Sequence, residues 1–124
     1  MNAPFELSLA DSEVSTITVD TGSVTLLFSA AAVRRGDDAG YVRRLRLSLR
    51  GVSRVQGTEG LGRIREGRLW VEGRVVAVPA LPSDPAGPAR VELVFQNGVM
   101  FAAEAASVAL NFDGDPGFVL SYAC

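Results

Sequence analysis

The sequence predicts a single all-β domain over residues 1–124, an antiparallel sandwich or barrel of about eight or nine short strands. Three observations predict this fold class. Apolar and polar residues alternate along most of the chain, which is the pattern of half-buried strands. Turn-forming residues separate the alternating stretches at regular intervals. A length of 124 residues and a hydrophobic content of 48% suit one domain with its own core.

The N-terminal part predicts a short strand over residues 5–9 and then a hairpin around a turn at 20–23. The expected cross-strand pairs are Val19 with Val24, Ile17 with Leu26, and Ser15 with Phe28. This register gathers the apolar side chains of both strands on one face. It leaves Thr16, Thr18 and Thr25 together on the other face, as a half-buried hairpin requires.

Residues 41–50 form the clearest two-faced strand of the sequence. One side carries Tyr41, Leu45, Leu47 and Leu49. The opposite side carries Arg44, Arg46, Ser48 and Arg50, which places three arginines in one row. The following stretch, 51–62, holds four glycines and is expected to be irregular, and a long strand covered on both sides is expected over 69–78. The proline-rich segment 79–89 predicts an exposed loop, because proline cannot donate to a sheet ladder.

A second hairpin is predicted around residues 97–98, because Asn-Gly is the preferred pair for a two-residue turn. This turn sets Phe95 opposite Met100. The face expected to lie in the core carries Val91, Leu93, Phe95, Met100 and Ala102, and it is apolar except for Glu104, which is expected opposite Val91. A strand is expected over 102–110, with one short helix as the alternative because the segment is rich in alanine. A final strand is expected over 118–122.

The composition excludes several kinds of active site. The chain has no histidine and therefore no imidazole for general acid–base catalysis or for metal binding. Its one cysteine, Cys124, cannot form an internal disulfide or a cysteine-rich zinc site. No apolar run reaches the roughly 20 residues that span a bilayer, and the start of the chain lacks the pattern of a signal peptide. We therefore expect a cytoplasmic protein that has no metal or cofactor and does not bind a membrane.

Arginine is crowded into one part of the chain. Residues 34–74 carry eleven arginines and five acidic residues, a net charge of +6, whereas the remaining residues carry one arginine and nine acidic residues. Such segregation predicts a surface that meets an anionic partner or an acidic surface of the protein itself. The candidate binding residues for an anionic partner are Arg43, Arg44, Arg46, Arg50 and Tyr41. Tyr41 and Trp70 are the aromatic side chains of this stretch that would stack on nucleobases.

The turn Asp20-Thr21-Gly22-Ser23 resembles the Asp-Thr-Gly motif of pepsin-like and retroviral-type aspartic proteases. The resemblance covers four residues only. It implies a catalytic aspartate, Asp20, which a second copy of the chain would have to complement, because this chemistry needs two aspartates that share a proton. The same four residues are also ordinary choices for a hairpin turn.

Three functions from different classes remain open for the sequence. The first is a non-enzymatic β domain for protein–protein association or self-assembly, present as a homo-oligomer or bound to a protein partner. The second is a binding module for an anionic ligand or single-stranded nucleic acid through Arg44, Arg46 and Arg50. The third is a dimeric aspartic-protease-like enzyme that acts through Asp20. The lack of a convincing catalytic set favours the first.

Overall fold

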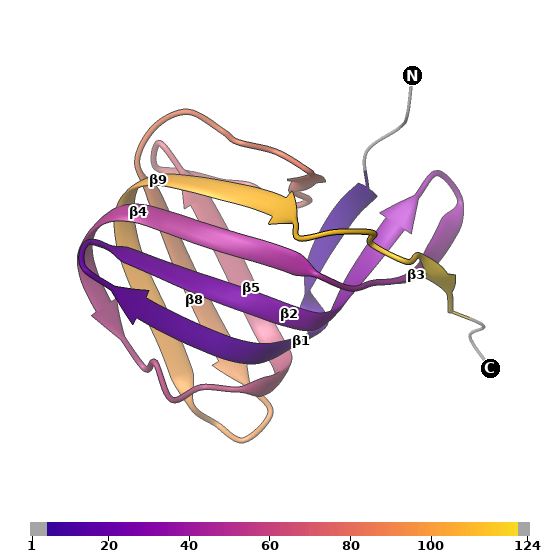
Figure 1. The fold of residues 1–124 in the computed structure, drawn as a ribbon, viewed down its shortest axis with the longest axis horizontal. Coiled ribbons are helices and arrows are strands. Elements are labelled where there is room, and N and C mark those ends of the chain that lie inside the picture. Colours follow the sequence, from indigo (N-terminus) through magenta and orange to yellow (C-terminus); the bar gives the residue numbers. More distant parts are fainter. Residues whose placement is uncertain (1–4, 122–124) are drawn as a thin grey trace.

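The computed structural model describes residues 5–121, which form an all-β structure (Figure 1). Six long strands close an antiparallel barrel in the order β1–β2–β4–β9–β8–β5, and β5 pairs back to β1. The barrel strands are β1 (Phe5–Asp20), β2 (Ser23–Arg35), β4 (Leu45–Gln56), β5 (Gly62–Val71), β8 (Ala89–Phe95) and β9 (Met100–Phe112). The short strands are β3 (Asp38–Val42), β6 (Arg74–Val75), β7 (Ala80–Leu81) and β10 (Val119–Leu120). The predicted all-β class is confirmed, and its architecture is a barrel.

Irregular positions in the long strands allow the sheet to close on itself. β1 shifts its register against β2 between Ser8 and Glu13, and Asp11 within this stretch has a φ of 71°. β4 shifts its register against β9 between Val52 and Arg54. Bulges of this kind bend a strand and increase its twist. β1 can therefore pair with β2 along one edge and with β5 along the other, as barrel closure requires.

A buried hydroxyl group satisfies the backbone where β1 is bulged. Ser12 is fully buried, and its side chain accepts a hydrogen bond from the N–H of Ala32 on β2 at 2.8 Å. The same hydroxyl donates to the carbonyl of Ser8 at 2.7 Å. The side chain of Ser12 thus gives the N–H of Ala32 and the carbonyl of Ser8 a partner where the bulge interrupts the ladder.

Side chains from every barrel strand fill the interior. The largest fully buried side chains are Phe28, Phe95, Phe101, Leu7, Leu26, Leu45, Leu47, Leu49, Ile64, Leu69, Leu81 and Leu93. Burial of one such side chain contributes about 1.5–3 kcal/mol. Because inward and outward residues alternate along each strand, this packing also fixes which residues face outward.

Beyond the barrel, β2 continues into a small extension, where it pairs with β3 and β3 pairs with β10 (Figure 1). The ring centroid of Phe5 lies 6.0 Å from that of Phe112 and 5.4 Å from that of Phe118. The guanidinium carbon of Arg35 lies 4.7 Å from the centroid of Phe118. The predicted C-terminal strand corresponds to β10, and Tyr122 lies outside the described residues.

The first hairpin has the predicted turn and most of the predicted register. The confirmed pairs are Val19 with Val24 and Ile17 with Leu26. The predicted pair of Ser15 with Phe28 is wrong, because Val14 takes the place opposite Phe28. β1 has an extra residue at this position, so the register shifts between the two halves of the hairpin.

The second hairpin departs from the predicted register by one residue. Residues 96–98 form a three-residue loop, and the N–H of Phe95 donates to the carbonyl of Val99 across it at 2.9 Å. Gly98 has a φ of 89°, as the last position of such a loop requires. A one-residue shift turns every side chain of the second strand to the other face. The core residues are Val91, Leu93, Phe95, Phe101, Ala103 and Ala105, whereas Met100, Ala102 and Glu104 face outward. Glu104 therefore lies opposite Arg90 rather than opposite Val91. The segment 102–110 is strand, and the alternative helix is wrong.

Two predictions for the middle of the chain hold only in part. The glycine-rich stretch predicted to be irregular over 51–62 continues β4 as far as Gln56, and only residues 57–61 lie outside the strands. The strand predicted over 69–78 is interrupted, because Glu72 and Gly73 have φ values of 52° and 77° and form a hairpin turn into β6. Val75 is consequently 56% exposed rather than covered.

The proline-rich segment 79–89, predicted to be an exposed loop, is anchored to the sheet along its first part. Pro79 and Leu81 are buried. The carbonyl of Pro79 accepts a hydrogen bond from the N–H of Leu7 at 2.8 Å, and β7 pairs with the start of β1. Proline at 79 is compatible with this edge position because its missing N–H is not needed by the ladder.

Candidate anion-binding surface

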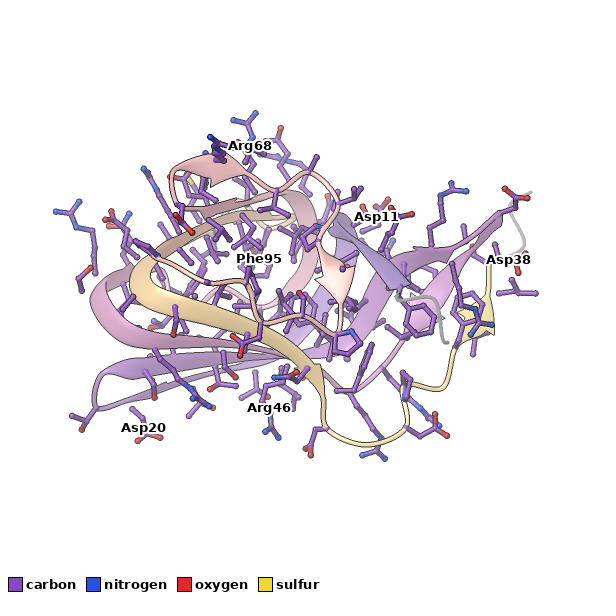
Figure 2. All side chains as sticks on the ribbon, turned by 90° about the horizontal axis from the view of Figure 1, so that it is seen from above. Asp11, Asp20, Asp38, Arg46, Arg68 and Phe95 are labelled. Carbon is purple, nitrogen blue, oxygen red and sulfur yellow. The ribbon has the colours of Figure 1, made fainter. Side chains whose placement is uncertain are left out.

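Strand β4 presents two of the predicted binding residues, Arg46 and Arg50, on the outside of the barrel. The leucines at 45, 47 and 49 are 0% exposed, so the alternation of the strand turns residues 46, 48 and 50 outward. This part of the predicted two-faced strand is confirmed. Figure 2 shows Arg46 and Asp20 projecting from one side of the barrel, with Phe95 inside it.

The neighbouring strands β1 and β2 add hydroxyl groups around these arginines. Thr25 of β2 lies beside Ser48 of β4 on one side and beside Thr18 of β1 on the other. Ser23 of β2 lies beside Arg50 in the next row. Together they belong to a shallow depression of about 480 Å³, lined by Thr16, Thr18, Ser23, Thr25, Leu27, Arg46, Ser48, Leu49 and Arg50.

A second depression of about 240 Å³ adjoins the first at Leu27. It is lined by Ser15, Leu27, Phe28, Ser29, Arg43, Arg44 and Asp113. Arg44 has a φ of 65° and lies before the start of β4, so the predicted row of three arginines along one strand is wrong for this residue. Arg43 and Arg44 nevertheless lie next to the other two arginines, through the second depression. We refer to the two depressions together as the arginine face.

Two backbone hydrogen bonds fix the chain at these arginines against the loop that follows β9. The N–H of Arg43 donates to the carbonyl of Pro116 at 2.7 Å. The N–H of Asp113 donates to the carbonyl of Arg44 at 2.8 Å. In the same loop, a Cβ atom at Gly117 would lie 2.8 Å from Nε of Arg43, so a larger residue there would displace this guanidinium group. The positions of Arg43 and Arg44 therefore depend on contacts between distant parts of the sequence.

One carboxylate neutralises part of the positive charge on the arginine face. Nη2 of Arg46 lies 2.8 Å from Oδ2 of Asp113, and the two side chains are 44% and 62% exposed. Within residues 5–121, Arg43, Arg44 and Arg50 have no carboxylate at ion-pair distance. An exposed pair contributes only ~0–1 kcal/mol and is screened by salt. The arginine face therefore keeps a surplus of positive charge.

The aromatic residues expected to stack on nucleobases lie away from the arginine face. Tyr41 is half-buried on β3, where it pairs with Val119 in the extension, and it lines neither depression. Trp70 lies on β5, and the guanidinium carbon of Arg90 is 5.3 Å from its ring centroid. Figure 2 shows Arg68, also on β5, on the side of the barrel opposite Arg46. The four predicted arginines are thus brought together without Tyr41 or Trp70.

Asp20, which carries the aspartic-protease resemblance, is the last residue of β1 and is exposed beside the hairpin turn. It pairs across the turn with Ser23. Protease chemistry would require a second copy to bring its own aspartate against this exposed tip. The protease hypothesis stays a prediction.

The sequence predicts the arginines of this face but not the hydroxyl groups around them. The alternation pattern places Thr16, Thr18 and Thr25 on the polar side of the first hairpin, and Ser48 on the polar side of β4. The two polar sides become one surface because β3 and then β4 pair with β2 in a single register, so β4 continues along the same edge of β2 that β3 occupies. Alternation identifies the polar side of each strand but not the strand that pairs with it.

In residues 5–121, no three histidine, cysteine or acidic side chains are grouped closely enough to hold a metal ion. The same part of the chain has no helix with the length and apolar composition needed to span a bilayer. No protein-family model matches this chain, and comparisons with curated proteins and with solved structures find no match either.

Proposed function

We propose that this protein is a binding module for a small polyanionic ligand, held at the arginine face. The observation that carries the proposal is the gathering of Arg43, Arg44, Arg46 and Arg50 around two adjoining depressions. Guanidinium groups bind carboxylate and phosphate oxygens through two parallel hydrogen bonds. Only one carboxylate of the described residues, that of Asp113, competes for them within ion-pair distance.

The hydroxyl groups of the arginine face indicate the rest of the ligand. Thr16, Thr18 and Thr25 each offer a group that both donates and accepts hydrogen bonds. Such groups suit the hydroxyls of a sugar or polyol as well as the oxygens of a phosphate. A phosphorylated polyol or a comparable polyanion therefore matches the arginine face better than an anion without hydroxyl groups.

The spacing of the arginines favours more than one anionic group on the ligand. Arg46 and Arg50 are four residues apart on one strand, so their Cα atoms lie roughly 13 Å apart. Arg43 and Arg44 extend the positive surface beyond Leu27. A ligand with several anionic groups engages more of these guanidinium groups than a single phosphate does.

The same geometry favours a small polyanion over single-stranded nucleic acid. Proteins that bind single strands combine a basic surface with aromatic side chains on which the bases stack. Tyr41 and Trp70 lie away from the arginine face, and neither lines its depressions. Phe28 lines the second depression but is only 1% exposed, so it offers no ring face for stacking.

Calorimetric titration with tripolyphosphate at low salt tests the proposal. The double variant Arg46→Gln/Arg50→Gln should bind at least about tenfold more weakly than the wild type, because two charge-assisted contacts are lost. The matched control Arg68→Gln/Arg74→Gln removes the same charge from exposed residues of β5 and β6 and should bind as the wild type does. Equal losses in both double variants would show that net charge alone attracts the probe, and the proposal would then be abandoned.

A second titration separates the two kinds of anionic ligand. Fluorescence polarisation with a labelled oligothymidine measures single-strand binding under the same conditions. Divided by the number of negative charges on the ligand, the binding free energy should be larger for tripolyphosphate than for the oligonucleotide. Tight oligonucleotide binding that is lost in Arg46→Gln/Arg50→Gln would replace the small polyanion with nucleic acid as the ligand of this face.

A further inference from the structure

The side of the barrel opposite the arginine face carries a different arrangement of charge. Cross-strand pairing sets one outward row as Arg54, Glu104, Arg90 and Trp70, on β4, β9, β8 and β5 in turn. The next row contains Gln56, Ala102, Glu92 and Arg68. A third row contains Met100, Val94 and Glu66. We call these three rows the mixed-charge face.

The mixed-charge face is hollowed around Arg90 and Glu104. Two depressions of about 440 and 180 Å³ share these two residues. Trp70 lines the larger depression and Met100 lines the smaller one. Met100 is 62% exposed and Trp70 is half-buried. Tryptophan, arginine and methionine are the residue types enriched in protein–protein interfaces, which points to a docking surface here.

Contacts within the chain hold Arg90 in place and leave Glu104 without an ionic partner. Arg90 forms an ion pair with Glu92, and its guanidinium carbon lies 5.3 Å from the ring centroid of Trp70. Glu104 lies between Arg54 and Arg90 in its row, but it forms no ion pair within the part of the chain that the structure describes. Its carboxylate is therefore available to a partner.

We propose that the mixed-charge face is the interface of a homodimer whose two-fold axis runs parallel to the strands, between β8 and β9. This goes beyond anion binding and depends on different residues. The two-fold operation lays β8 of each copy over β9 of the other. Arg90 then lies opposite the partner's Glu104, and Trp70 lies opposite the partner's Arg54. Because the axis is two-fold, each of these contacts occurs twice.

The two-fold rotation also creates no unfavourable contact in the other rows of the mixed-charge face. It places Arg68 opposite the partner's Gln56, and Val94 opposite the partner's Met100. Like charges do not face each other at any of these positions. A partner of one charge sign would instead meet both arginines and glutamates across this face, at a cost in affinity. The alternation of charge therefore fits a second copy of this chain.

Sedimentation equilibrium and light scattering over a range of concentrations test the interface. We expect a species of twice the 13.1 kDa monomer mass that dissociates on dilution. Glu104→Arg sets two arginines against each other at two symmetry-related places, so it should raise the dimer dissociation constant at least about tenfold. The charge swap Arg90→Glu/Glu104→Arg restores both opposite-charge pairs and should recover the dimer. Arg50→Glu, on the arginine face, is the matched control and should leave the dimer unchanged.

Three results would overturn the interface: a monomeric wild type at the highest concentration, an unchanged dimer in Glu104→Arg, or a folded charge swap that stays monomeric. Circular dichroism confirms the fold of each variant. If a charge variant does not fold, Met100→Glu takes its place, because this exposed side chain contributes little to the monomer and lies against the partner's Val94. Tripolyphosphate binding should be unchanged in Glu104→Arg, so loss of the dimer and loss of the anion site are told apart.

Discussion

The two outer faces of the barrel are made by the same curved sheet, and they differ in how charge is arranged on it. The arginine face gathers four arginines and, within residues 5–121, has one carboxylate at ion-pair distance. The mixed-charge face alternates three arginines with three glutamates over its rows. A surplus of one sign suits a ligand of the opposite sign, whereas alternating signs suit a copy of the same surface. The inward residues are apolar on both sides of the barrel, and the outward residues alone give the two sides different charge arrangements.

The arginines that are crowded together in the sequence are divided between the two faces. Arg46 and Arg50 reach the arginine face on the first half of β4, where it pairs with β2. Arg54 follows a register shift and joins the mixed-charge face, opposite Glu104. Arg68 lies on β5, on the far side of the barrel (Figure 2). The positive segment of the sequence is therefore divided between two surfaces, because β4 changes register and bends between Val52 and Arg54 and β5 lies on the far side of the barrel.

The largest expected effect is a loss of folding stability, which would disrupt both faces at once. Phe95 is 0% exposed, and Phe95→Ala leaves a cavity in the interior that holds the two faces apart. We expect the free energy of unfolding to fall by about 3–5 kcal/mol, measured by urea denaturation. Val119→Ala, at a position 64% exposed, is the control and should change it by less than about 0.5 kcal/mol. Similar losses in both variants would contradict the packed interior.

A smaller effect is expected on the side of the barrel formed by β1 and β2. Ser12→Ala removes the only side chain that bonds the N–H of Ala32 in the described hydrogen bonds, so this part-buried group loses that partner. We expect a loss of about 1–3 kcal/mol in unfolding free energy. Amide exchange should also be faster at Ala32 than at Leu93 on β8. Ser121→Ala, at an exposed position, should change neither quantity, and equal protection of the two amides would argue against the bridging role.

The smallest effect sharpens the charge difference itself. Asp113→Asn releases Arg46 from its ion pair without moving any arginine. Affinity for tripolyphosphate should rise about two- to fivefold, in line with the modest strength of an exposed pair. Asp37→Asn makes the same change in net charge in the turn between β2 and β3 and should give a smaller increase. An equal rise in both variants would assign the effect to long-range charge rather than to Arg46.

Short-range features of the fold were predictable from the sequence. The tight turn at 21–22 fixes the pairing of Val19 with Val24, and strong alternation fixes the burial of the leucines in β4. The register of the second hairpin was not predictable, because Gly98 suits a two-residue or a three-residue loop equally well. Alanine, which dominates β9, is tolerated inside and outside a barrel, so Ala102 and Ala103 did not reveal which face is buried.

The candidate site was predictable only in part, for a related reason. Arg46 and Arg50 follow from the pattern of one strand, but the threonines beside them come from the pairing of β4 with β2 and of β2 with β1, which alternation within one strand does not give. Arg44 departs from its strand because it takes a left-handed conformation, and alternation does not mark such a residue. Trp70 is near Arg50 in the sequence yet lies on a different face, since several strands separate the two around the barrel.

Leu27 lines both depressions of the arginine face and forms the boundary between its two guanidinium pairs. This boundary is hydrocarbon, while both of its sides are polar. Under the proposed function, a polyanion long enough to bridge the two pairs has to cross this side chain. The arginine face would then sort polyanions by their length, which neither pair of arginines can do alone.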